Sequence, residues 1–258
     1  MSLESSDNAA VPPKGPNPDL YPDLAAAGGL TAALEQVAAD LGLDLGPVQR
    51  NDSDDNWTVP GPAGGREPLS IRLGSQERWF IIEGWSQGVR LIHGATQDLQ
   101  EVAKAATAWR AGATLHELRG LCAFVTFSEL AEAHERGPAD AVTVKWRLLR
   151  EEMREDIPFP TVRDLVEAAH AEPKLRQLYP FTSHWSLHFT TCTGYPFTWV
   201  VPFVDPLRDG RYRVCGPDRG TVIGEADTAE QAIALVISHL PTSIGPAVAG
   251  TARDLVGG

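Results

Sequence analysis

Histidine and aromatic side chains concentrate between Arg176 and Trp199, and this segment holds most of the chain's potential for chemistry. If residues 183–192 form a strand, side-chain alternation puts His184 and His188 together on its polar face. Residues four apart on a strand are separated by about 13 Å, so these two imidazoles cannot share one metal ion. They could flank a substrate and transfer protons near neutral pH, which makes both candidate catalytic residues. An ordinary solvated strand face is the alternative.

Four further side chains are candidates for binding a substrate. Arg176, Tyr179 and Trp199 lie in the same segment and offer one cation and two aromatic rings. His93 ends a predicted strand just before a predicted helix cap, where an anion or a catalytic group could sit. A structural role for His93 is the alternative, with Glu83 on the preceding strand as a potential partner.

The usual catalytic motifs are absent from the sequence. It contains no phosphate loop, no nucleophile elbow, no His-Glu-x-x-His and no Cys-x-x-Cys. These motifs reflect geometric requirements that are hard to meet in another way, so ATP-dependent transfer, serine hydrolysis and zinc hydrolysis are disfavoured. The three cysteines, Cys122, Cys192 and Cys215, lack metal-binding spacing and are expected to be free thiols. We expect neither a metal ion nor another cofactor.

The charge pattern argues against nucleic-acid binding. The first 60 residues carry ten acidic side chains against Lys14 and Arg50, which accounts for −8 of the formal net charge of −12. The remaining body is nearly neutral and has no basic stripe that could neutralise several phosphates. No apolar stretch approaches the roughly 20 residues that cross a bilayer, and the first residues lack the features of a secretory signal. We therefore expect a cytoplasmic protein that binds neither nucleic acid nor membrane.

The patterning divides the chain into four predicted parts. Residues 1–20 are expected to form a disordered acidic tail, because they are rich in proline and poor in apolar anchors. An N-terminal α+β region over 21–136, a helical connector over 137–178 and a β-rich region with a closing helix over 179–258 follow. In the N-terminal region we predict a helix over 22–41, a loop over 51–65, strands over 69–73, 78–83 and 89–93, and helices capped by Thr96, Thr114 and Thr126.

The second half repeats the change from helix to strand. Because the strands come in two series with helices between them, a doubly wound parallel sheet is disfavoured. The predicted fold class is α+β, with two antiparallel β-sheet regions separated by a helical middle segment. The predicted elements are helices over 138–153 and from Thr161, strands over 183–192, 197–204, 211–215 and 221–225, and a closing helix over 228–240 that Asp227 caps.

The chain contains four distinctive stretches: Trp109-Arg-Ala-Gly-Ala-Thr-Leu-His-Glu-Leu118, Phe124-Val-Thr-Phe-Ser-Glu-Leu-Ala-Glu-Ala-His-Glu-Arg-Gly137, Tyr179-Pro-Phe-Thr-Ser-His-Trp185 and Gly224-Glu-Ala-Asp-Thr-Ala-Glu230. Together they resemble an actinobacterial family of unknown domain function that is usually labelled a natural-product biosynthesis protein. The resemblance spans about Leu20 to Thr251 and implies a role in secondary metabolism. It supplies no catalytic residues that could be placed on this chain.

A fold-level analogy suggests a partner. Three strands followed by helices, here from residue 69 to about 136, is the order of small domains that bind the leader of a ribosomally made peptide as an added edge strand. We therefore hypothesise a cofactor-independent tailoring protein for such a peptide, in its most specific form a lanthipeptide-type cyclase. His184 or His188 would then accept the thiol proton. The alternative is a non-catalytic binding module, as an immunity-type protein or a partner of a biosynthetic enzyme. A homo-oligomer is open in both cases.

Overall fold

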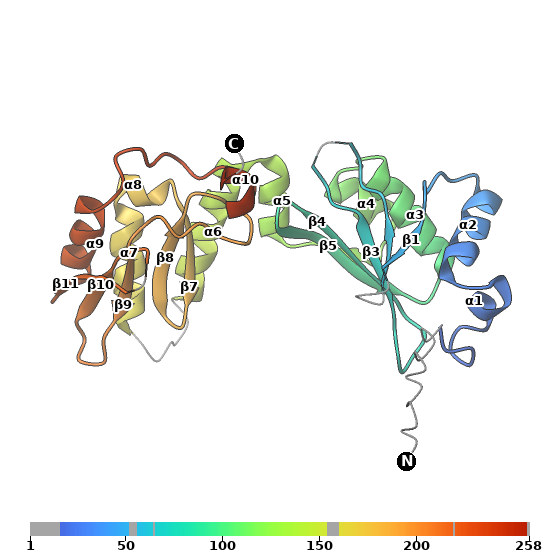
Figure 1. The fold of residues 1–258 in the computed structure, drawn as a ribbon, viewed down its shortest axis with the longest axis horizontal. Coiled ribbons are helices and arrows are strands. Elements are labelled where there is room, and N and C mark those ends of the chain that lie inside the picture. Colours follow the sequence, from blue (N-terminus) through green and yellow to red (C-terminus); the bar gives the residue numbers. More distant parts are fainter. Residues whose placement is uncertain (1–15, 52–55, 64, 154–159, 219, 257–258) are drawn as a thin grey trace, which may run out of the picture. The chain divides into compact units, whose positions relative to one another are not determined.

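The chain forms two compact units, shown as a ribbon in Figure 1. The N-terminal unit runs to Gly84 and resumes from Ile92 to Thr126; the C-terminal unit comprises Trp85–Leu91 and the chain from Phe127 onward. Most of the predicted disordered tail lies outside the residues that the structure describes. The computed structural model describes residues 16–51, 56–63, 65–153, 160–218 and 220–256.

Both units combine helices with an antiparallel sheet, which confirms the predicted α+β class and the two sheet regions. One sheet has six described strands side by side in sequence order, and apart from Trp85–Leu91 its residues belong to the N-terminal unit. None of the described helices of either unit is both long and apolar enough to cross a bilayer. The strands are β1 (Gln49–Asn51), β2 (Asn56–Val59), β3 (Leu69–Leu73), β4 (Phe80–Ser86), β5 (Val89–Thr96) and β6 (Val125–Thr126).

The predicted loop over 51–65 is wrong in part, because β2 lies inside it. Trp57 and Val59 are 4% and 0% exposed and alternate with half-buried neighbours, so they supply the two inward positions of a short strand. Trp57 pairs with Ile71 of β3 in the antiparallel register. The many aspartate, glycine and proline residues around this short strand obscured its alternation.

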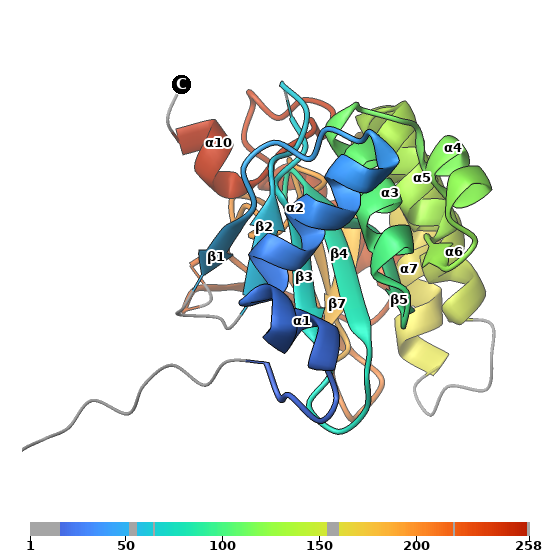
Figure 2. The ribbon, with the colours of Figure 1, turned by 90° about the vertical axis from the view of Figure 1, so that its right-hand side faces the viewer.

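Helices cover one face of this sheet, and Figure 2 shows α1 and α2 lying across its strands. The predicted single helix over 22–41 is two helices, because Gly28 and Gly29 have φ of +88° and +132° and end the first one. The capping box of Thr114 and Glu117 is confirmed. The helices are α1 (Pro22–Ala27), α2 (Leu30–Leu41), α3 (Leu99–Arg110) and α4 (Leu115–Leu121).

Three other predicted caps are displaced by one or two residues. Thr96 belongs to β5 and Asp98 caps α3 by accepting a hydrogen bond from the Gln100 backbone N–H at 2.8 Å. Thr126 likewise belongs to β6, and Ser128 caps the helix that follows. Thr228, rather than Asp227, caps the closing helix. In each case a second capping residue type stands beside the predicted one, so composition alone does not separate them.

The C-terminal unit places helices against one face of five described strands in the order β11-β10-β9-β8-β7. The predicted strand over 197–204 is wrong for 197–202, which form a loop before β9. The elements are α5 (Glu129–Arg136), α6 (Pro138–Glu152), α7 (Pro160–Ala171), α8 (Pro173–Arg176), β7 (Tyr179–Ser183), β8 (Ser186–Thr190), β9 (Phe203–Pro206), β10 (Tyr212–Cys215), β11 (Val222–Ala226), α9 (Ala229–Ser238) and α10 (Ala252–Val256).

Trp146 of α6 anchors the core of the C-terminal unit. Its side chain is 1% exposed, and its indole N–H donates to the Leu178 carbonyl at 3.1 Å. The ring contacts His170 of α7 and Phe189 of β8, with centroids 5.4 and 6.2 Å away. One side chain therefore joins two helices to the sheet and satisfies the carbonyl that precedes β7.

We expect Trp146→Ala to lower the free energy of unfolding by about 3–5 kcal/mol, because it removes the ring and leaves a cavity. Trp146→Phe keeps most of the volume but leaves the Leu178 carbonyl without its donor, which costs about 1–3 kcal/mol. Urea unfolding of both variants measures these losses. Trp185→Phe, at a site 41% exposed, is the control and should change little. A cost for Trp146→Ala no larger than that of the control would contradict this role.

His134 of α5 is a half-buried histidine whose Nε2 atom is buried. Its Nε2 atom has no hydrogen-bond partner among the described residues, and its ring lies 5.9 Å from that of Tyr179. Burial lowers the pKa of His134 from 6.5 to about 4. The unfolded chain therefore binds a proton at this residue at a higher pH than the folded protein does. The free energy of unfolding decreases as the pH falls below about 6.5.

His134→Leu should remove this pH dependence. Between pH 7 and pH 4 the wild-type protein should lose on the order of 2 kcal/mol more unfolding free energy than the variant, a value that allows for partial exposure of the ring. Chemical unfolding at a series of pH values measures the difference. His116→Leu removes an exposed histidine and should keep the wild-type slope. Parallel pH profiles for wild type and His134→Leu would show that burial of this imidazole has no energetic consequence.

Candidate functional site

The predicted strand over 183–192 is a hairpin. β7 ends at Ser183, β8 begins at Ser186, and His184 and Trp185 form the turn with φ of +51° and +72°. Positive φ at both central residues is the conformation of the type I′ hairpin turn, although asparagine and glycine are the usual residues there. His184 and Trp185 are both exposed as a result. The expectation that His184 and His188 share one strand face is therefore wrong.

Two residues of the face predicted to be polar are buried. His188 and Thr190 are 5% and 0% exposed, while Leu187 and Phe189 on the opposite face belong to the helix-covered core. The β8 face that carries His188 is therefore not a solvated strand face, and His184 and His188 do not share it.

Aromatic rings enclose the His188 imidazole on three sides. It stacks against Phe181 of β7 at 5.0 Å and against Phe203 of β9 at 4.5 Å, with interplanar angles of 16° and 28°. Trp199 meets it edge-on at 5.2 Å and 82°. Phe181 stands directly opposite His188 in the strand register, so the pairing of β7 with β8 creates this stack.

The other predicted binding residues separate from one another. Tyr179 is 4% exposed and part of the core, where burial raises the pKa of its hydroxyl. Arg176 is exposed at the end of α8. His93 belongs to the N-terminal unit, where its Nε2 atom lies 3.1 Å from the Thr126 hydroxyl. Of the predicted set, only His188 and Trp199 are in contact.

The loop over 191–202 presents large apolar side chains to solvent. Tyr195, Trp199 and Val200 are 71%, 41% and 45% exposed, and we call these three residues the Trp199 surface. The Trp199 ring rests edge-on against Phe181 at 5.7 Å, and the Tyr195 ring meets Phe197 at 5.7 Å. Phe181 and Phe197 therefore support the exposed rings of Trp199 and Tyr195.

Threonine side chains fix this loop to β8. The Thr198 hydroxyl accepts a hydrogen bond from the Thr191 backbone N–H at 2.9 Å and lies 2.8 Å from the Thr190 hydroxyl. The Thr198 backbone N–H in turn donates to the Thr190 hydroxyl at 3.1 Å. We had not predicted Thr190, Thr198 or Tyr195 as site residues. Only the density of aromatic residues around them pointed to this segment.

A second polar cluster lies on the same sheet face. Asp205 of β9 accepts hydrogen bonds from the Ser186 hydroxyl and, at 3.6 Å, from the Cys215 thiol. Burial, followed by the nearby Asp205 charge, raises the pKa of Cys215 to about 11. Burial also raises the pKa of Cys122 to about 11. Both thiols are therefore protonated at neutral pH and are poor nucleophiles.

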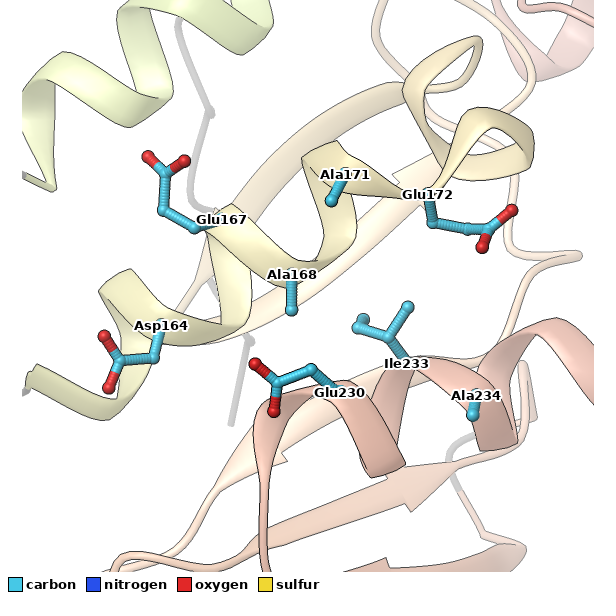
Figure 3. Close-up of a pocket in the computed structure, with 8 residues that line it drawn as sticks. All are labelled: Asp164, Glu167, Ala168, Ala171, Glu172, Glu230, Ile233 and Ala234. Atoms are coloured by element: carbon cyan, nitrogen blue, oxygen red, sulfur yellow. The ribbon is translucent and has the colours of Figure 1, made fainter.

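The hollow between α7 and α9 has a volume of about 570 Å³ and is shown in Figure 3. Ala168 and Ile233 point toward each other at its floor, while Glu167 points away from α9. The Glu167 carboxylate forms an ion pair with Arg150 at 2.7 Å, and Glu172 caps α8. The acidic side chains around this hollow do not converge on one point. No group of three or more potential metal ligands is found in the described part of the chain.

The N-terminal unit offers little edge for an added strand. Of the three strands in the leader-binding analogy, β3 pairs with β2 and β5 pairs with β6. The outer described strands, β1 and β6, are three and two residues long. Short outer strands give a peptide few main-chain groups to pair with.

One comparison with known proteins gives a match. Residues 140–251 match the model of a family described as a family of unknown function (DUF6193). No curated protein and no solved structure matches the chain. The matched stretch lies within the C-terminal unit and covers less than half of the chain. The C-terminal unit, which carries the Trp199 surface, is therefore similar to an uncharacterised protein family.

Proposed function

We propose that this protein is a binding module for a polypeptide partner and that the Trp199 surface makes the contact. The observation that carries the proposal is the exposure of Tyr195, Trp199 and Val200 within one short loop. Tryptophan and tyrosine dominate the energetics of protein–protein contacts, because they bury a large area at a small cost in side-chain entropy. Large apolar side chains that gather on a surface are typical of such contacts.

The rigidity of the loop supports binding. Hydrogen bonds between Thr190, Thr191 and Thr198 tie Thr198 to the start of the loop and to the end of β8, and Phe181 supports the Trp199 ring. A surface that is already ordered loses less conformational entropy when its partner binds, so more of the contact energy appears as affinity.

The geometry favours binding over the cyclase hypothesis. A cyclase needs an accessible base near a substrate thiol. His184 lies exposed in a turn, whereas His188 is 5% exposed and enclosed by rings. The two residues thus have separate environments, and neither combines accessibility with an enclosed substrate space.

The resemblance to natural-product biosynthesis proteins suggests which partner to test first. We propose a ribosomally made precursor peptide, or an enzyme that modifies it, encoded beside the gene for this protein. Either partner fits the notion of an actinobacterial biosynthetic assembly in which this protein holds a peptide without transforming it.

Two tryptophan variants test the Trp199 surface. Calorimetric titration with the polypeptides encoded by the flanking genes should give a complex with the wild-type protein. Trp199→Ala should weaken the complex at least tenfold, about 1.4 kcal/mol or more, because it removes a central aromatic contact. Trp185→Ala is a matched control, since Trp185 is also 41% exposed but lies in the β7–β8 turn. Equal affinities of the two variants, or no complex with any flanking product, would overturn the proposal.

A second measurement separates binding from cyclisation. The wild-type protein is incubated with the dehydrated precursor peptide, and free thiols are counted by alkylation and mass spectrometry. We expect the thiol loss to equal the uncatalysed background. Faster loss that disappears in the double variant His184→Ala and His188→Ala would support the cyclase hypothesis instead.

A further inference from the structure

A pocket of about 440 Å³ opens in the C-terminal unit beside the last turn of the chain. Its walls come from the loop after β8, from the segment over 241–248 and from α10. The side chains that matter for its chemistry are Thr191, Val200, Ser243, Ile244, Val248 and Leu255. No charged residue lines it.

Exposed apolar side chains converge on this pocket. Val200, Val248 and Leu255 are 45%, 44% and 43% exposed and come from three separate segments of the chain. Full burial of such a side chain gains about 1.5–3 kcal/mol relative to exposure. Three of them around one hollow form a place where an apolar ligand would displace water from several sides at once.

Backbone hydrogen bonds hold the walls in place. The Val248 N–H donates to the Thr191 carbonyl, and the Thr193 N–H donates to the Val248 carbonyl, both at 3.0 Å. These bonds align the two segments as a short parallel bridge. At the start of α10 the Asp254 carboxylate accepts hydrogen bonds from the backbone and hydroxyl of Thr251, at 2.7 and 2.8 Å. The pocket is thus formed before any ligand arrives.

The size and chemistry of the pocket select its occupant. A volume of about 440 Å³ falls in the range of small-molecule sites, whereas a helix about 10 Å across would need a much longer groove. An ionised ligand would find no counter-charge on the walls. The hydroxyls of Thr191 and Ser243 offer the polar contacts that orient a ligand.

We propose that this pocket binds an uncharged, mainly apolar small molecule, with Val200, Ile244, Val248 and Leu255 as its apolar contacts and Ser243 as its polar one. The pocket shares Val200 with the Trp199 surface but recognises a different kind of ligand, and the proposal does not depend on the polypeptide partner. It adds a small-molecule ligand to a unit that resembles a family of unknown function.

The neutral fluorescent probe N-phenyl-1-naphthylamine tests the pocket. Titration into the wild-type protein should give a saturable rise in fluorescence with one probe bound per chain. Val248→Trp and Leu255→Trp place bulk at the mouth from two different segments, and each should weaken probe binding at least tenfold. Val222→Trp is the matched control, because Val222 is 57% exposed on β11 and does not line the pocket. It should bind the probe as the wild-type protein does.

Two outcomes would overturn the proposal. One is a probe signal that does not saturate, or unchanged probe binding by both Val248→Trp and Leu255→Trp when circular dichroism shows that these variants are folded. The other is occupation of the pocket by a second copy of the chain. Sedimentation would then show a dimer that Val248→Trp dissociates, and probe binding would appear only as the protein is diluted.

Discussion

The hydrogen bonds between Thr190, Thr191 and Thr198 decide what the C-terminal unit presents to solvent. They tie Thr198, inside the loop over 191–202, to the start of the loop and to the end of β8. Each bond contributes only about 0.5–1.5 kcal/mol to stability, but together they limit the loop to one path across the sheet. That path lays Trp199 against Phe181 and His188 and leaves Tyr195 and Val200 facing outward. The proposed function depends on this arrangement.

The same packing sets the surroundings of His188, which looked reactive in the sequence. Pairing of β7 with β8 sets Phe181 opposite His188, and Phe203 closes the other side of the imidazole. Burial raises the pKa of the Cys122 and Cys215 thiols to about 11, so neither is a thiolate at neutral pH. These two thiols are therefore poor nucleophiles at neutral pH, whereas exposed rings on a rigid support suit the recognition that we propose.

The fold class could be predicted from the sequence because its signals are local. Alternation over 69–73, 78–83 and 89–93 lies within β3, β4 and β5 or close to their bounds, and Thr114 and Glu117 form the predicted capping box. The predicted helix ends were wrong where the local sequence was compatible with more than one cap or end position. Asp98 competes with Thr96 as a cap two residues away, and the predicted helix over 22–41 ran through Gly28 and Gly29, although their backbone ends the first helix.

The candidate site was harder to predict because tertiary contacts define it. The turn at His184 and Trp185 has positive φ at residues that rarely adopt it, so no glycine or asparagine marked the hairpin. Without that turn, alternation assigned His184 to the wrong environment. The threonine contacts join residues seven and eight apart across a loop, so they follow from the path of the loop and not from helix or strand periodicity. The abundance of aromatic residues identified the segment but not which of its rings stay exposed.

The most direct test of this account is amide hydrogen exchange in the loop over 191–202. The Thr191 and Thr198 amides donate to threonine hydroxyls, so both should exchange much more slowly in the wild-type protein than in an unstructured peptide. Thr198→Val should remove the protection of the Thr191 amide while Trp146 stays buried. Like Trp199→Ala, it should also weaken partner binding. Fast exchange of both amides in the wild-type protein would contradict the claim that a fixed loop presents the Trp199 surface.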